Sequence, residues 1–426
     1  MKTAIGPIRV AFDNVVSNYV FLCLMGALTI TTMPVYAGTM ASTEWGLVAF
    51  CATVQNFVLI IERILAPLMA RDVASVTRPE GVWRVFQAYS RLYNLMAATG
   101  LAFALFLVLI SRTTNCCGLA LLADAPLVWC GAMAQLSFQL ANASATGYWN
   151  GTQQQHKSNR RAFGFAALKH TVALVVVTQF AAFAVAYVVT FAAVGYLELL
   201  FNRRNVLRDI ELTDVSGDSS FFRLAHGALA GYVAASLLGM LSSQVDRLVL
   251  AATLPVADFG SYYLVSTIAL MLLHLQAPIH RALLPLMVRN SETTRDTAFL
   301  LCLSFFLVVL PSLSVALFAE PLLHMWLASP NWKFAATVTD AMTSTLRLLA
   351  VAVAASTVFS PVSILLLRDR RYLDMAVINL LQLMAASAVL FFVASEQGLI
   401  AGGYAWLAGS VVQVAVAATF AIRRLV

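Results

Sequence analysis

Stretches of about twenty apolar residues recur along the whole chain, and they limit its fold more than any other feature. A helix needs roughly 20 mostly apolar residues to cross a bilayer. Hydrophobic residues make up 61% of the chain and charged residues only 11%, against about 25% charged residues in a soluble domain. The sequence therefore predicts an all-α integral membrane protein. Twelve transmembrane helices are expected, at 15–38, 45–70, 92–110, 124–148, 165–183, 184–202, 227–251, 259–287, 297–319, 341–366, 374–394 and 398–422.

The polar segment "DIELTDVSGD" divides these helices into two sets of six. We predict an N-terminal lobe over residues 1–210 and a C-terminal lobe over residues 211–426. The split near residue 183 rests on length alone, because the apolar stretch there offers almost no turn residues. If that stretch is one tilted span, the count falls to eleven. Lys2 and Arg9 lead into a full-length apolar run, so no cleaved signal peptide is expected.

The distribution of positive charge predicts the topology, because cytoplasmic loops collect Lys and Arg. With the N-terminus inside, the predicted outer loops hold only Arg112 and Lys333. Most other basic residues fall in inner segments, among them Lys169, Arg203, Arg204 and Arg208. We therefore expect a multi-pass protein with both termini in the cytoplasm. The same rule explains the net charge of +7, so no nucleic-acid partner is expected.

A short motif occurs once in each half of the chain. "ERILAPLMARD" begins at Glu62 and "HRALLPLMVRN" begins at His280. The ungapped alignment matches Arg63 with Arg281 and Pro67 with Pro285. An even number of helices in each half gives both copies the same orientation, so the lobes are expected to be related by a pseudo-two-fold axis along the membrane normal, as in parallel-repeat transporters.

The two matched prolines, Pro67 and Pro285, are hinge candidates. Proline removes a backbone donor and bends a helix where it occurs in the interior. One interpretation is a pair of hinges that close an inner gate. The alternative is a static bend, because proline is common in membrane helices.

Four arginines are predicted to lie inside the spans: Arg63, Arg281, Arg247 and Arg347. A charge at the bilayer centre costs roughly 2.5–3.5 kcal/mol on insertion scales, so it usually faces protein or water and has a function. The first interpretation is interhelical ion pairing. The available acidic partners are Glu62 and Asp246, with Glu320 and Asp340 nearer the outer ends. The second is a hydrated site for an anionic headgroup, since the guanidinium fork matches phosphate oxygens. The shortage of deep carboxylates favours the second.

Glu62, Asp246 and His280 are candidates for coupling transport to an ion. His280 stands where Glu62 stands in the first copy of the motif, so an imidazole replaces a carboxylate. Neighbours on a helix point about 100° apart, so neither Glu62 and Arg63 nor Asp246 and Arg247 are expected to pair with each other. Metals and cofactors are not expected, because the six cysteines have no ligand spacing and neither a Walker A motif nor HExxH occurs.

The order of several segments resembles the Wzx-type polysaccharide flippases of the multidrug/oligosaccharidyl-lipid/polysaccharide exporter superfamily. They are "MASTEWGLVAF", "RILAPLMARDVAS", "SSQVDRLVLAATLPVADFGSYYLVSTIA" and "RALLPLM". In that family an aspartate near the end of helix 7 precedes an aromatic-Gly-x-Tyr pattern. Here these correspond to Asp246 and "FGSYY". The chain departs from the family at Glu62 and Arg63, where an acidic-x-Gly pattern is expected.

The resemblance implies a V-shaped, MATE-like transporter in the bacterial inner membrane rather than an enzyme. It would move an undecaprenyl-diphosphate-linked oligosaccharide to the periplasmic leaflet by alternating access, for O-antigen, lipopolysaccharide or other surface polysaccharide synthesis. Its partners would be this substrate and membrane lipids, with a polysaccharide polymerase and a chain-length regulator as further candidates. The alternatives are a cation-coupled multidrug exporter of the same fold and a membrane glycosyltransferase or polymerase. Short predicted outer loops disfavour the enzymes.

Overall fold

The computed structural model describes residues 2–76, 79–111, 124–210, 228–276, 302–327 and 338–425. In these ranges the chain is helical, without strands. Nine of the described helices are long and apolar enough to cross a membrane, and two bent helix pairs raise the number to eleven. The prediction of an all-α, multi-pass membrane protein is therefore confirmed. The helices form two compact units, Met1–Thr32 with Thr39–Leu224 and Met33–Gly38 with Ala225–Val426.

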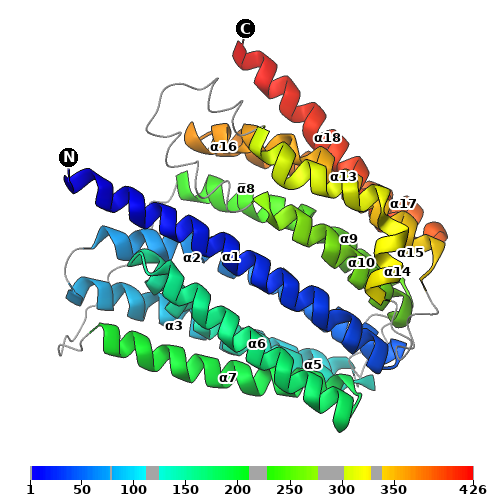
Figure 1. The fold of residues 1–426 in the computed structure, drawn as a ribbon, viewed down its shortest axis with the longest axis horizontal. Helices are drawn as coiled ribbons and strands as arrows, with labels where there is room; N and C mark the ends of the chain where they lie inside the picture. Colours follow the sequence, from blue (N-terminus) through cyan, green and yellow to red (C-terminus); the bar gives the residue numbers. More distant parts are fainter. Residues whose placement is uncertain are drawn as a thin grey trace. The chain divides into compact units, whose positions relative to one another are not determined.

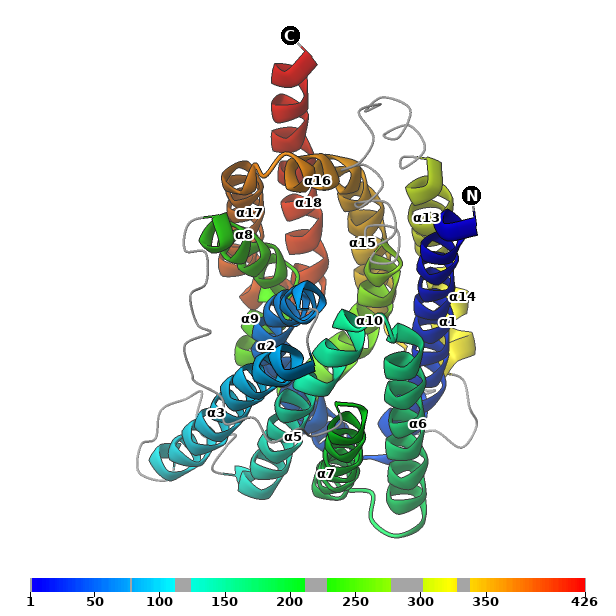
Figure 2. The ribbon, with the colours of Figure 1, turned by 90° about the vertical axis from the view of Figure 1, so that its left-hand side faces the viewer.

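The first unit contains most of α1 (Lys2–Thr39) and five further helices (Figures 1 and 2). Polar contacts join α1 to α6, where the Asn18 and Asn159 side-chain amides hydrogen-bond at 2.9 Å. The predicted split near residue 183 is confirmed, since α6 ends at Gln179 and α7 begins at Ala184. The five helices are α2 (Ser42–Ser75), α3 (Pro79–Ser111), α5 (Pro126–Gly151), α6 (Gln155–Gln179) and α7 (Ala184–Asp209).

Helix α5 is the core of the first unit, because it packs against α2, α3, α6 and α7. It begins with Pro126, which suits the first turn of a helix because its missing N–H would be unpaired there. Buried Trp129, Leu136 and Leu140 supply the apolar contacts. It also carries polar residues such as Gln135 and Asn142, and it is not among the helices apolar enough to qualify as spans. Neighbouring helices, not lipid, therefore satisfy its polar groups.

Small residues let α5 and α2 approach closely at the repeated motif. A Cβ atom at Gly151 would lie 2.6 Å from Val73 Cβ and 2.7 Å from the Ala70 carbonyl oxygen. A Cβ at Gly147 would lie 2.5 Å from Met69 Sδ. Gly147 and Gly151 form a GxxxG pattern, which allows backbones to pack together in membranes. The end of α2 after Pro67 is thus held against α5.

The second unit is built around α18 (Ile400–Leu425), which packs against α15 (Asp340–Thr357) and α17 (Tyr372–Gln397). Gly398, with φ at 56°, separates α17 from α18 in a conformation that L-residues rarely adopt. Figure 2 draws α17 beside α8 (Ala228–Ser242), in agreement with their packing. The remaining helices are α9 (Val245–Thr253), α10 (Val256–His274), a π-helical turn (Phe305–Val309), α13 (Leu310–Leu317), α14 (Ala319–Leu327) and α16 (Phe359–Arg368).

Two predicted helices of this unit are broken. The span predicted at 227–251 is α8 followed by α9, with a bend of 45° at Ser243 and Gln244. The side chains of Ser242 and Ser243 donate to helix carbonyls, at 2.8 Å to Leu238 and 2.8 Å to Met240, and such bonds help a helix to bend. The span predicted at 297–319 ends in a bend of 81° between α13 and α14. Apolar length alone did not indicate either bend.

Candidate functional site

Arg247 lies in the interior of the second unit and is 2% exposed. Its Nε donates to Ser266 Oγ at 3.0 Å and its Nη2 donates to Thr267 Oγ1 at 3.0 Å. The guanidinium also stacks over the Tyr263 ring, 4.6 Å from the centroid. No carboxylate in the described ranges lies at ion-pair distance from it. Neutral groups of α10 therefore hold this cation.

Asp246 is also buried, at 1% exposure, and it accepts a hydrogen bond from the Tyr262 hydroxyl. Its Oδ1 atom has no hydrogen-bond partner in the described structure. The indole N–H of Trp406 lies near enough to act on this carboxylate, although no hydrogen bond joins them. As predicted for neighbours in sequence, Asp246 and Arg247 make different contacts. The aspartate and the tyrosine of the "FGSYY" pattern bond directly to each other.

The bend between α8 and α9 determines where Asp246 and Arg247 lie, because both come directly after it. Asp246 and Arg247 lie in the first turn of α9, where exposed N–H groups and the helix dipole favour a negative charge. Gly402 on α18 makes room for Tyr262, because a Cβ there would lie 2.4 Å from the tyrosine oxygen. Interrupted helices often form binding sites in membrane transporters. This cluster is therefore the strongest candidate site among the predicted residues that the structure describes.

Arg347 lies elsewhere in the second unit, on α15. Its side chain is 49% exposed and lies 3.6 Å from the Glu320 carboxylate on α14. This contact has the geometry of the first interpretation, an interhelical ion pair. The structure does not bring Arg347 into the Arg247 cluster.

The other predicted site residues are described only in part. Glu62 lies on α2, partly buried and within electrostatic range of Tyr93 on α3. Arg63 and Pro67 also lie on α2, which continues unbroken past the proline, but their side chains fall outside the described structure. The same holds for the whole of His280, Arg281 and Pro285. Their roles stay predictions.

A polar network crosses the interior of the first unit, and the sequence analysis missed it. Lys169 Nζ lies 2.5 Å from Glu198 Oε2, and their side chains are only 19% and 11% exposed. Asn142 donates to the other carboxylate oxygen at 3.1 Å, and Asn202 donates to Asn142 at 3.0 Å. Next to Lys169, the His170 ring lies 3.1 Å from Thr32 Oγ1. The pair joins α6 to α7 and neutralises both charges.

A signal for this pair exists in the sequence. Lys169 was counted with the inner segments although it falls within the span predicted at 165–183, and α6 starts as early as Gln155. The lysine is therefore inside the helix. A lysine and a glutamate inside two helices joined by one short turn are expected to meet, because a single charge there is costly.

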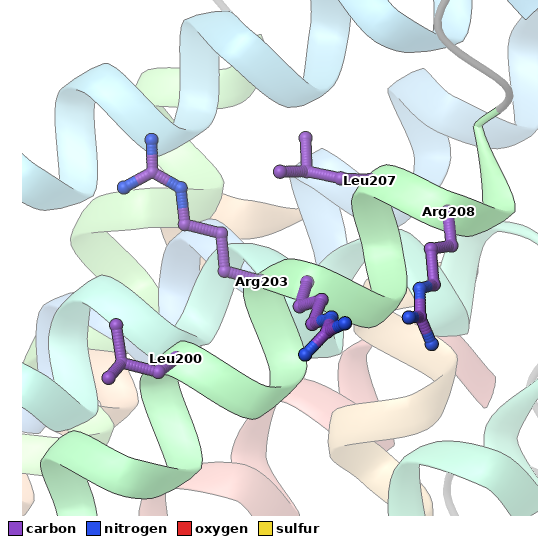
Figure 3. Close-up of a pocket in the computed structure, with 5 residues that line it drawn as sticks. Leu200, Arg203, Leu207 and Arg208 are labelled. Atoms are coloured by element: carbon purple, nitrogen blue, oxygen red, sulfur yellow. The ribbon is translucent and has the colours of Figure 1, made fainter.

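An arginine-rich pocket of about 360 Å³ lies on the surface of α7. Figure 3 shows Leu200, Arg203, Leu207 and Arg208 projecting from this helix. Arg203, Arg204 and Arg208 are all exposed, and no ion pair holds them among the residues that the structure describes. They come from a segment predicted to face the cytoplasm, so the positive-inside rule accounts for the charge.

Comparison with solved structures identifies the fold class of the chain. No family profile matches the chain, and no curated protein does. Solved structures match it over almost its full length. A MOP superfamily transporter from Pyrococcus furiosus matches with a TM-score of 0.69 and 11% identity over 98% of this chain and 95% of its own. The lipid II flippase MurJ matches at 0.72 and 9%, over 97% and 87%. The MATE multidrug transporter DinF-BH matches at 0.69 and 13%, over 97% and 95%.

These similarities establish the architecture. The chain has the fold of MOP superfamily membrane transporters, as the predicted fold class requires. They do not separate a lipid-linked substrate from a drug, since one match is a lipid II flippase and another a multidrug transporter.

Proposed function

We propose that this MOP-fold transporter moves a polyprenyl-diphosphate-linked oligosaccharide across the bacterial inner membrane. The substrate would pass from the cytoplasmic to the periplasmic leaflet by alternating access, with both termini of the protein in the cytoplasm. Its diphosphate would be attracted by Arg247, which is buried inside the second unit. Arg63, Arg281 and Arg347 are further candidates, each to be tested on its own. A polymerase that consumes the exported glycan is a proposed partner.

The observation that carries this proposal is the environment of Arg247. Within the described structure, the buried Glu198 is neutralised by Lys169, whereas the buried Arg247 is held by neutral hydroxyls and a ring. Asp246 lies within electrostatic range of Arg247, but no carboxylate in the described ranges lies at ion-pair distance from the guanidinium. The guanidinium can therefore still pair with an anion that hydrogen-bonds to it. The similarity to a solved lipid II flippase supports the same class of substrate.

A cation-coupled multidrug exporter is the second candidate, and Asp246 favours it. Its Oδ1 atom is buried without a partner, and the aromatic residues Tyr262 and Trp406 lie close to it. A carboxylate among aromatic rings suits an organic cation or a coupling proton. The test of the proposal must therefore measure both kinds of transport.

The test uses a strain that lacks its own flippase and a panel of lipid-linked glycans. We expect the parent to restore periplasmic glycan. Arg247→Gln should lower export about tenfold or more at equal membrane abundance, because the variant loses the positive charge. Arg247→Lys keeps the charge but not the guanidinium fork, so its export should lie between that of the parent and that of Arg247→Gln. Arg63→Gln, Arg281→Gln and Arg347→Gln are measured in parallel. Arg208→Gln is the matched control, since it removes an exposed arginine from α7.

Two results would overturn the proposal. If all four span variants export like the parent, arginines do not bind the headgroup. If the parent restores no glycan of the panel but expels cationic dyes, and Asp246→Asn abolishes that efflux, the multidrug exporter replaces the flippase. Gel filtration in detergent shows whether each variant is folded.

A further inference from the structure

A cavity of about 250 Å³ lies within the second unit, separate from the groups that hold Arg247. Helices α8, α15, α16, α17 and α18 contribute to its wall, so it belongs to one compact unit. At about 30 Å³ per water, it has room for on the order of eight waters or for a ring-sized group.

The described wall carries hydrogen-bonding groups but no charge. Serine, asparagine and glutamine side chains line it, and no Asp, Glu, Lys, Arg or His does. Such a wall offers nothing to balance a diphosphate, and the Asp246 carboxylate, although close to Trp406, does not line the cavity. An unbalanced charge away from water is costly. The cavity is therefore suited to a neutral polar group.

Two of its polar groups are buried and have no partner. The Nε1 atom of Trp406 and the Oε1 atom of Gln413 form no hydrogen bond in the described structure, and the two residues are 8% and 7% exposed. The Trp406 N–H also lies near the Asp246 carboxylate, so Gln413 is the clearer case of an unpaired group. Unpaired buried polar groups are rare and need an explanation. Both lie on the face of α18 that lines the cavity. They are seven residues apart, or about 10 Å along a helix, so a single water cannot satisfy both.

The serines make the rest of the wall rich in acceptors. Ser242, Ser243, Ser356 and Ser363 each donate their hydroxyl proton to a helix carbonyl. Each oxygen keeps lone pairs that can accept a hydrogen bond. A ligand that fits this wall must present several donors without carrying charge, and sugar hydroxyls do so.

The cavity wall also has apolar surface, which can contact the C–H face of a sugar ring. Phe359, Met375 and the Trp406 ring line the same cavity. A pyranose ring has C–H faces and hydroxyl edges, so it can lie against an aromatic face while its edges form hydrogen bonds. Water alone would leave these apolar faces without a contact.

We infer that this cavity binds a neutral sugar ring, with Trp406 donating to it and Gln413 accepting from it. This inference rests on the proposed function in one respect, since the ring would belong to the transported glycan. The cavity would then recognise a sugar of the glycan, while the arginines attract the diphosphate.

The first test measures binding to the full-length protein in lipid nanodiscs by saturation-transfer NMR. The probes are methyl glycosides of neutral hexoses, 6-deoxyhexoses and N-acetylhexosamines. We expect at least one to bind, and Trp406→Phe and Gln413→Leu each to weaken it about three- to tenfold, as for one lost hydrogen bond. Tyr404→Phe is the matched control, because this exposed residue is also on α18.

The second test separates this inference from the proposed function. In proteoliposomes, Trp406→Phe and Gln413→Leu should slow transfer of a glycosylated polyprenyl diphosphate but not of the sugar-free carrier. If glycosides bind as expected and no lipid-linked substrate moves, the inference stands and the proposed function fails. If lipid-linked glycan moves but no probe binds, or both variants behave like Tyr404→Phe, the cavity holds only water and the inference is overturned.

Discussion

Two ion pairs join α6 to α7 in the described structure, and Lys169–Glu198 is more deeply buried than Lys157–Asp209. Removing one member of a buried pair leaves the other charge without compensation, which typically costs about 3–5 kcal/mol. We predict that Lys169→Met lowers the free energy of unfolding by this order. Adding Glu198→Gln should recover most of the loss, because Asn142 can still donate to the amide oxygen. Thermal unfolding in detergent, followed by intrinsic fluorescence, measures both effects.

The exposed pair Arg347–Glu320 provides the control for this prediction. Arg347→Met removes an arginine that is 49% exposed, and surface pairs contribute about 0–1 kcal/mol. Its unfolding temperature should stay near that of the parent. If Lys169→Met and Arg347→Met lowered the unfolding temperature equally, burial would not determine how much an ion pair contributes to stability.

The bond from Tyr262 to Asp246 gives a second prediction at this scale. Tyr262→Phe leaves a buried carboxylate without its donor, and an unsatisfied buried group costs about 1–3 kcal/mol. We therefore expect a lower unfolding temperature for Tyr262→Phe. Tyr196→Phe, at a tyrosine that is 46% exposed, should change little in the same assay. A stable Tyr262→Phe protein would show that this hydroxyl does not support the carboxylate.

The candidate site could be predicted residue by residue only where charged residues interrupt an apolar stretch. Arg247 and Asp246 were identified in this way, and both are buried. The sequence did not indicate what surrounds them, because Ser266, Thr267 and Trp406 are ordinary residues of membrane helices. Glu198 was missed because its partner Lys169 was counted only as a basic residue of the inner segments. Partners depend on helix packing, which a single sequence does not specify.

Among the helices, the close contact of α5 with α2 supports a prediction. Gly151→Ala places a Cβ within 2.7 Å of the Ala70 carbonyl oxygen, so the helices must separate, at a cost of about 1–3 kcal/mol. Gly164→Ala is the matched control, since a Cβ on this α6 glycine meets nothing within 4 Å. Gly164→Ala should raise the free energy of unfolding by about 0.5–1 kcal/mol, because alanine loses less conformational entropy than glycine when the helix forms.

Thermal unfolding of the two glycine variants side by side tests this contact. Opposite shifts are expected, downward for Gly151→Ala and upward for Gly164→Ala. Two upward shifts would mean that α2 can move away from α5 without loss, and the end of α2 after Pro67 would then be free to act as a hinge.

Helix positions were easier to predict than helix interruptions. The expected helices at 341–366 and 374–394 lie within α15 with α16 and within α17, and the one at 398–422 matches α18 except for its first two residues. Twenty apolar residues between polar turns define a span. The bend at Ser243 and Gln244 has no proline or glycine to mark it. It depends on local side-chain bonds and on the packing of α8 against α17.

At the scale of the whole molecule, the solved transporters match over nearly the full chain at identities of 9–13%. The fold therefore does not depend on the identity of most individual side chains. This explains why the fold class could be predicted while the transported molecule is a proposal. It also means that the orientation in the membrane needs its own experiment.

The two ends of α6 test the proposed orientation. In a cysteine-free background, His156→Cys should resist a membrane-impermeant maleimide in intact cells, because nearby Lys157, Arg160 and Arg161 favour the cytoplasm. Gln179→Cys, at the other end of the helix, should react. Both residues are exposed, so both cysteines should react once the cells are permeabilised. The reverse pattern in intact cells would place the N-terminus outside, and a cytoplasm-to-periplasm flippase would then have to be abandoned together with the predicted topology.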